Sequence, residues 1–350
     1  MSPAIRVLVV DDSAFSRKVM REVLQAQDGL EVVGAAHDGL DALEKIEALR
    51  PDVITLDLVM PHLDGLGVLH ALRGKLSPRV VVVSSADTRS EQVIAALGEG
   101  AVDFVHKPTA LATDMLYEIG LELARKVKAA ARANVPAEVL PLPLLPESRK
   151  RVEHLGPARR VVVIGTSTGG PQALGRLIPQ LSADFPAPVA VVLHIPVGYT
   201  RALAQRLDEQ SALEVVESEA GSRLLPGRVM LARAGVHLKL SGKGALCVAR
   251  QTTSPSDSPH RPSVDALFLS AAESWGADVV AVVLTGMGND GTEGARAVRA
   301  AGGRVLIQSE PSCIIYGMPR SVHEAGLASH QAGLEEMPEL LLRWAQEDLA

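Results

Sequence analysis

The stretch VVVIGTSTGGPQAL (Val161–Leu174) combines four apolar residues, a turn rich in glycine and hydroxyl groups, and a segment with helical spacing. Short apolar runs of this kind are typical of parallel strands that are covered on both faces. Pro171 suits the first turn of a helix, because that position needs no backbone N–H donor. The stretch therefore predicts a strand, a tight turn and a helix, the repeating unit of a parallel α/β sheet.

From Val161 onward the sequence continues to alternate apolar runs with amphipathic segments. We expect strands at Val161–Ile164, Val189–His194, Leu213–Val216, Arg228–Leu231, Ala245–Val248, Val279–Leu284 and Arg304–Ile307. We expect helices at Pro171–Leu181, Tyr199–Glu209, Ser263–Ser274, Gly291–Ala301 and Met337–Gln346. A loop is expected at Gln251–Pro262, which is rich in serine and proline. The pattern predicts a doubly wound, Rossmann-like parallel sheet for residues 159–350.

Residues 1–123 show a separate alternation of the same kind. We expect strands at Ile5–Val10, Val32–Ala36, Val53–Leu58, Val80–Ser84 and Val102–Val105, and helices at Ser16–Gln25 and Gly39–Ala48. This order predicts a flavodoxin-like, doubly wound domain. Residues 124–158 include a proline-rich segment, and closely spaced prolines disfavour both helix and sheet, so we expect a semi-rigid linker there.

Composition limits the possible classes of function. The chain has 350 residues, of which 47% are hydrophobic and 22% charged, so two globular domains can form cores. The net charge is −6, without the basic footprint of a nucleic-acid-binding protein, so we expect no nucleic-acid partner. Neither a signal peptide nor a membrane-spanning run is visible, and Cys247 and Cys313 form no disulfide framework. We expect a cytoplasmic protein without direct membrane insertion.

Residues 165–169 match G-x-S-x-G, the pattern of a tight turn that presents a serine nucleophile, here Ser167. The pattern is short, and a phosphate-binding turn ahead of a helix N-terminus is the competing interpretation. A P-loop is disfavoured because no Gly-Lys-Ser/Thr ending follows. A dinucleotide fingerprint is disfavoured because His194, not an acidic residue, closes the following apolar run.

Two further residues turn Ser167 into a candidate triad. His194 ends the run PVAVVLH, and Asp290 lies in the glycine-rich turn of DVVAVVLTGMGNDG. Taken alone, His194 could be a structural histidine and Asp290 a helix N-cap. Taken together, Ser167 would attack a carbonyl, His194 would transfer the proton, and Asp290 would orient the imidazole. The chain order Ser…His…Asp differs from that of α/β-hydrolases.

The residues around these three could support the same chemistry. Glycines flank Met287, so the backbone amide of Met287 can turn toward a developing oxyanion, where one such donor is worth about 3 kcal/mol. Thr166 and Thr168 flank the nucleophile. They either help to orient His194 or serve only in the turn.

The first domain places charged residues at the ends of its predicted strands. Asp11, Asp12 and Asp57 follow two strands, and clustered carboxylates need a cation among them, for which Mg²⁺ is suited. Ser84 or Ser85 ends the fourth strand, and Lys107, followed by Pro108, ends the fifth. A lysine at this edge can offset the charge of an acyl phosphate formed at Asp57.

These segments, VLVVDDS, ITLDLVMPHLDG, VVVSS and FVHKP, resemble the receiver domain of bacterial response regulators over about residues 3–123. The resemblance implies that a histidine kinase phosphorylates Asp57, and that Asp11, Asp12 and Asp57 hold Mg²⁺. It also implies that Ser84 and Phe104 shift on phosphorylation; an ordinary core role for Phe104 is the alternative.

The second domain resembles the catalytic domain of bacterial chemotaxis protein-glutamate methylesterases, through IGTSTGGPQAL, VVLHIPVGYT, HRPSVDALF, VLTGMGNDG and IIYGMPR. The resemblance implies hydrolysis of glutamate γ-methyl esters on methyl-accepting chemoreceptors and deamidation of receptor glutamines, without a cofactor for hydrolysis. It further implies a chemotaxis histidine kinase as phosphodonor, and a receiver that inhibits the enzyme until Asp57 is phosphorylated.

Two other functions compete with this one. A receiver fused to a nucleotide- or effector-binding module would use GTSTGG and TGMGNDG as phosphate cradles and hydrolyse nothing. Phosphate binding does not need His194, whereas acyl transfer does. A receiver-controlled transcription factor is disfavoured by the acidic balance of the chain and by strands where a small basic helical module would stand.

Overall fold

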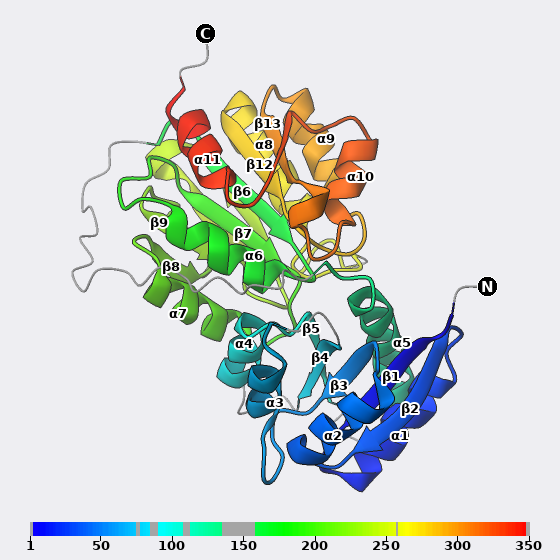
Figure 1. Cartoon of the computed structure of the whole chain (residues 1–350). Coiled ribbons are helices and arrows are strands. Elements are labelled where there is room, and N and C mark those ends of the chain that lie inside the picture. The colour runs from blue at the N-terminus through cyan, green and yellow to red at the C-terminus, as the bar shows by residue number, and fades with distance from the viewer. Residues whose placement is uncertain are drawn as a thin grey trace. The chain divides into compact units, whose positions relative to one another are not determined.

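The computed structural model describes residues 3–74, 78–84, 90–107, 113–134, 158–256 and 258–347. The chain divides into two compact units, Met1–Leu140 and Pro141–Ala350 (Figure 1). Ser85, Pro108 and residues 135–157 of the expected linker lie outside the described residues. Among the described helices, none combines the length and the apolar character needed to cross a bilayer.

The first unit is a five-stranded parallel sheet in the order β2-β1-β3-β4-β5. Its strands are β1 (Ile5–Val10), β2 (Leu30–Ala36), β3 (Val53–Leu56), β4 (Arg79–Ser84) and β5 (Asp103–His106). Its helices are α1 (Ala14–Gln25), α2 (Gly39–Leu49), α3 (Gly65–Leu72), α4 (Ser90–Gly98) and α5 (Thr113–Ala130). Helix α1 packs against α5, while α2, α3 and α4 form a second row. The predicted doubly wound fold is confirmed for this unit.

The second unit is built on a seven-stranded sheet in the order β14-β13-β12-β6-β7-β9-β8, in which every described pair is parallel. Its strands are β6 (Val161–Thr166), β7 (Val189–Leu193), β8 (Glu214–Glu217), β9 (Arg228–Leu231), β12 (Val279–Val283), β13 (Arg304–Gln308) and β14 (His330–Ala332). Its helices are α6 (Gly170–Leu177), α7 (Thr200–Gln210), α8 (Val264–Trp275), α9 (Thr292–Ala300), α10 (Met318–Glu324) and α11 (Met337–Gln346). An antiparallel hairpin of β10 (His237–Ser241) and β11 (Val248–Thr252) completes it.

Strand β6 is the central strand of this sheet. The chain leaves β6 for β7 on one side and later returns to β12 on the other side. In open parallel sheets such a reversal leaves a crevice at the carboxyl ends of the strands, where ligands bind. The topology therefore directs attention to the residues that follow β6, β7 and β12.

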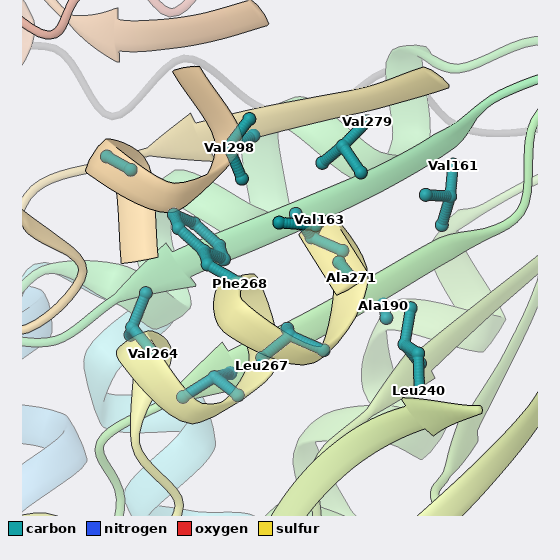
Figure 2. Packing of buried hydrophobic residues seen from close by; sticks show 14 of the residues in the cluster. Val161, Val163, Ala190, Leu240, Val264, Leu267, Phe268, Ala271, Val279 and Val298 are labelled. Carbon is teal, nitrogen blue, oxygen red and sulfur yellow. The ribbon is translucent and has the colours of Figure 1, made fainter. Parts of the chain in front are cut away.

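Helix α8 packs directly on the sheet, against β6, β12 and β7 (Figure 2). Phe268 of α8 is fully buried in the core, and burying a side chain of this size is worth about 1.5–3 kcal/mol. At Gly165, an added Cβ would lie 2.2 Å from Cγ1 of Val264, so only glycine allows the first turn of α8 to lie against β6. This close packing fixes the N-terminus of α8 next to the end of β6.

Several predicted elements need correction. The apolar run Ala245–Val248 was predicted as a strand, but residues 244–246 form a short 3-10 helix and the strand is Val248–Thr252. Gly242 and Gly244 adopt positive φ angles, and the turn between β10 and β11 includes most of the residues that the apolar pattern assigned to a strand. The expected loop Gln251–Pro262 accordingly begins inside β11, and β10, β14 and α10 were not predicted.

Candidate active site

Ser167 follows directly on β6 in a turn that leads into α6. Its backbone N–H donates to Thr285 O at 3.1 Å, and its carbonyl accepts from Gly170 N at 2.7 Å. Gly169 caps the helix with a φ of +79°, a conformation that favours glycine. The Ser167 side chain is half-buried, and Gly286 approaches it so closely that an added Cβ would lie 2.8 Å from the Ser167 Cβ.

His194 lies on the neighbouring strand at the same edge of the sheet. Thr166 pairs with Leu193, the last residue of β7, and His194 N donates to Thr166 O at 3.1 Å. The hydroxyl of Thr166 is buried and donates to Thr285 O at 2.7 Å. Thr166 therefore contacts His194 through its backbone carbonyl, while its side chain joins β6 to the strand end of β12.

The imidazole of His194 pairs with Asp290, which lies in the turn between β12 and α9. The distance from His194 Nε2 to Asp290 Oδ2 is 2.7 Å, and both side chains are less than a tenth exposed. The other ring nitrogen, Nδ1, is buried and has no hydrogen-bond partner in the described part of the chain. Since Nε2 donates to the carboxylate, Nδ1 is the nitrogen left to accept a proton.

The Asp290 carboxylate is held at the N-terminus of α8. It accepts from Val264 N at 2.8 Å, from Asp265 N at 2.9 Å and from Ser263 Oγ at 3.0 Å. Burial alone would raise the pKa of Asp290, but the hydrogen bond and charge of His194 and these backbone amides hold the pKa well below its usual range. Asp290 is therefore ionised at neutral pH and can stabilise a positively charged imidazole.

The helix that follows Asp290 is capped by a different residue. Asp265 Oδ1 accepts from Gly291 N at 3.0 Å and from Gly294 N at 2.7 Å, at the start of α9. The N-cap alternative for Asp290 is thus wrong, because its carboxylate contacts α8 and His194. Burial raises the pKa of Asp265 to about 6, and the nearby Asp290 charge acts in the same direction.

The Met287 turn lies beside Ser167 at this edge. Gly286 N donates to Ile315 O at 3.0 Å, and Gly286 O accepts from Met318 N at 2.9 Å, so the turn is fixed on both sides. The backbone N–H of Met287 has no acceptor among the described residues. Thr168 is buried, and its carbonyl accepts from Thr285 Oγ1 at 3.0 Å. Oxyanion binding by Met287 and a supporting role for Thr168 both stay predictions.

Sequence reasoning missed several residues around the His194–Asp290 pair. The His260 ring stacks on the His194 ring, with the centroids 3.9 Å apart and the planes at 15°. Ser263 caps α8 and also donates to Asp290, and His237 contacts the backbone of Ser263. A serine placed just before an apolar helical run could have indicated the cap, but no sequence pattern connects that cap to Asp290.

The acidic cluster of the first unit forms at the switch point between β1 and β3. Carboxylate oxygens of Asp11, Asp12 and Asp57 lie within 4.8 Å of one another. Lys107 Nζ lies 2.5 Å from Asp11 Oδ2 and 2.6 Å from Asp57 Oδ2. Burial raises the pKa of Asp11 although Lys107 acts against that shift. An all-oxygen donor set with more negative charge than one lysine neutralises fits a hard divalent cation such as Mg²⁺.

Of the two predicted switch residues, Ser84 ends β4 and Phe104 is the second residue of β5. Ser84 is fully buried, and its Oγ has no hydrogen-bond partner in the described ranges. Phe104 is also buried, and Lys126 Nζ lies 5.5 Å from its ring centroid. Their shift on phosphorylation stays a prediction.

Comparison with known proteins agrees with this division of the chain. The family described as CheB methylesterase matches residues 162–341, and the response regulator receiver domain matches residues 7–117. A Myxococcus xanthus protein named protein-glutamate methylesterase/protein-glutamine glutaminase 5 is 60% identical over 340 residues, covering 97% of each chain. A Thermotoga maritima protein-glutamate methylesterase/protein-glutamine glutaminase is 41% identical over 339 residues, covering 97% of this chain and 98% of the relative.

A solved structure resembles the second unit. The crystal structure of the Thermotoga maritima CheB methylesterase catalytic domain covers 53% of this chain and 97% of its own, with a TM-score of 0.51 and 42% sequence identity. Since the catalytic family matches more than half of the chain, and since the relatives align over nearly their whole length, the chain belongs to the CheB methylesterase family, with a response regulator receiver domain ahead of the catalytic domain.

Proposed function

We propose that this protein hydrolyses glutamate γ-methyl esters on methyl-accepting chemoreceptors to glutamate and methanol, and deamidates particular receptor glutamines to glutamate. The names and lengths of its relatives support this substrate class. Both reactions transfer an acyl group to water, so one site can perform both. The two cysteines are free thiols, which supports a cytoplasmic location.

Ser167 is the proposed nucleophile. Its Oγ attacks the ester or amide carbonyl, and His194 Nδ1 takes the hydroxyl proton while Nε2–H remains bonded to Asp290. The protonated His194 then gives its proton to the leaving group, which departs as methanol from the ester or as ammonia from the glutamine amide, and an acyl group stays on Ser167. Water, deprotonated by His194, then attacks the acyl carbon. The bond to Ser167 Oγ breaks, His194 returns the proton to Oγ, and the side chain of the receptor is left as glutamate.

Met287 is the proposed oxyanion donor. Its amide has no acceptor among the described residues and lies in the turn that packs on Ser167. A backbone N–H donor that is already in position stabilises the oxyanion of the transition state by about 3 kcal/mol. Thr168 is proposed to support the turn through its buried position next to Ser167.

The receiver is proposed to control this activity. A chemotaxis histidine kinase supplies the phosphoryl group to Asp57, and phosphorylation relieves inhibition by the receiver. Asp11, Asp12 and Asp57 would hold Mg²⁺, which supplies positive charge to offset the phosphoryl oxygens. Lys107 already contacts Asp57, and Ser84 and Phe104 would respond to the modification. We propose a receiver at 1–123, a linker at 124–158 and a catalytic domain at 159–350, with α5 continuing across the first of these boundaries to Ala130.

The observation that carries the proposal is the His194–Asp290 pair at the switch point beside Ser167. A phosphate cradle, the alternative interpretation, would require neither residue. The test is methanol release from receptor-containing membranes that carry methyl esters, measured with and without Mg²⁺ and a small acyl phosphate as phosphodonor. We expect release that the phosphodonor stimulates. Failure to release methanol under both conditions would contradict the proposed hydrolase function.

A further inference from the structure

His237 is a buried histidine outside the proposed triad. It is the first residue of β10 and has no exposed surface. Its Nε2 lies 3.1 Å from Pro255 O, and its Nδ1 lies 3.2 Å from Ser263 N. A carbonyl can only accept and a backbone N–H can only donate, so the ring must carry its proton on Nε2 and keep Nδ1 as an acceptor.

The partner of Nδ1 belongs to the segment that holds Asp290. Ser263, Val264 and Asp265 together donate three hydrogen bonds to the Asp290 carboxylate. The hairpin that carries His237 is fixed along the same helix, because Leu240 N donates to Ser270 Oγ at 3.0 Å and Ser274 Oγ donates to Leu240 O at 3.1 Å. His237 therefore connects the hairpin to the first turn of α8.

We propose that His237, as a neutral imidazole, is a positioning residue for catalysis: its Nδ1 fixes Ser263, and through the first turn of α8 it sets the position of Asp290 against His194. This proposal rests on the proposed function of the triad. A protonated His237 would direct an N–H at the Ser263 N–H and push the two groups apart.

The surroundings of His237 favour the neutral ring. Burial lowers the pKa of His237, and the charges of Arg261 and Lys239 act in the same direction. The Pro255 carbonyl and the Asp290 charge act in the opposite direction and do not outweigh burial.

Two substitutions separate the two hydrogen bonds of the ring. In His237→Asn, the amide oxygen stands near the place of Nδ1 and keeps an acceptor for Ser263. In His237→Gln, the amide nitrogen reaches the place of Nε2 and keeps the donor to Pro255 but loses that acceptor. We expect His237→Gln to lower kcat about tenfold with little change in KM, because small misplacements of catalytic groups are costly. His237→Asn should retain most of the wild-type kcat.

A double-mutant cycle tests whether His237 acts through Asp290. In an Asp290→Ala background, adding His237→Gln should leave the residual kcat unchanged within about twofold, because the group being positioned is gone. Equal losses of kcat in the Asn and Gln variants, or full additivity with Asp290→Ala, would overturn the proposal and leave His237 a merely structural residue.

A spectroscopic readout keeps the proposal testable if a variant fails to fold or the enzyme has another substrate. In ¹⁵N spectra of the full-length wild-type protein at neutral pH, His237 should be neutral with its proton on Nε2. In folded His237→Gln, the imidazole N–H resonance of the His194–Asp290 hydrogen bond should shift or broaden, whereas in His237→Asn it should stay. A cationic or Nδ1-protonated His237 would overturn the proposal. Absence of methanol release by the wild type would instead count against the proposed function.

Discussion

His194 Nε2 lies 2.7 Å from Asp290 Oδ2, which joins two residues 96 positions apart in the chain. The pair forms because β6 lies between β7 and β12, so the turns that follow these strands meet at one edge of the sheet. Two backbone amides in the first turn of α8 also hold the carboxylate. Position in the sheet, rather than proximity in the chain, assembles this site.

Replacing the Asp290 carboxylate by an amide should reduce hydrolysis strongly. In Asp290→Asn, the amide can present an N–H to the imidazole and favour the wrong tautomer, so we expect kcat to fall about 10⁴-fold. Methanol release from methylated receptor measures this loss. Asp184→Asn, at an exposed position before β7, is the matched control and should retain wild-type kcat. A comparable rate in both variants would show that Asp290 does not orient His194.

The close approach of Gly286 to Ser167 predicts a steric effect. In Gly286→Ala, the new Cβ would lie 2.4 Å from Met318 Sδ and 2.8 Å from Ser167 Cβ, so the nucleophile or the Met287 turn must move. We expect kcat to fall about 10²-fold, the cost of a displacement of about 1 Å. Methanol release and circular dichroism together test this expectation.

Gly175 provides the matched control for that substitution. It lies in α6, and an added Cβ would meet nothing within 4 Å. Gly175→Ala should therefore raise the free energy of unfolding by about 0.5–1 kcal/mol through helix propensity and leave kcat unchanged. If Gly286→Ala were as active as Gly175→Ala, tight packing at Ser167 would not matter for turnover.

The raised pKa of Asp265 predicts a dependence of stability on pH. With a folded pKa of about 6 and an ordinary unfolded value, the folded state retains a proton that the unfolded state loses. This contribution to stability is fully present below the unfolded pKa and is lost as the pH rises through about 6. Relative to Asp265→Asn, the wild type should lose unfolding free energy between pH about 4 and about 6. Urea unfolding at a series of pH values tests the sign, and a constant difference across this window would contradict it.

Phosphorylation control should depend on Asp57. Its carboxylate lies at the acidic cluster and contacts Lys107, so Asp57→Asn should remove the stimulation of methanol release by a small phosphodonor, and chelation of Mg²⁺ should do the same in the wild type. Asp28→Asn, at an exposed turn between α1 and β2, should retain the response. An undiminished response of Asp57→Asn would place the phosphorylated residue elsewhere.

The sequence predicted most strands of both parallel sheets because these strands contain runs of Val, Ile and Leu, whereas β14, with the sequence HQA, was not predicted. It also predicted that Ser167, His194 and Asp290 would lie at strand ends. It did not predict β10, because HLKLS is short and because the nearby apolar run Ala245–Val248 has the pattern of a strand. The contacts of Asp290 with Ser263 and α8 could not be predicted either, because they depend on how closely α8 packs against Gly165.

The central claim is that Ser167 is the nucleophile served by the His194–Asp290 pair. The most direct test compares methanol release from methylated receptor by full-length Ser167→Ala and by Ser182→Ala, a serine exposed near the start of β7. We predict that Ser167→Ala releases no methanol above background while its circular dichroism and unfolding free energy match the wild type, and that Ser182→Ala is fully active. Substantial release by folded Ser167→Ala would contradict the account.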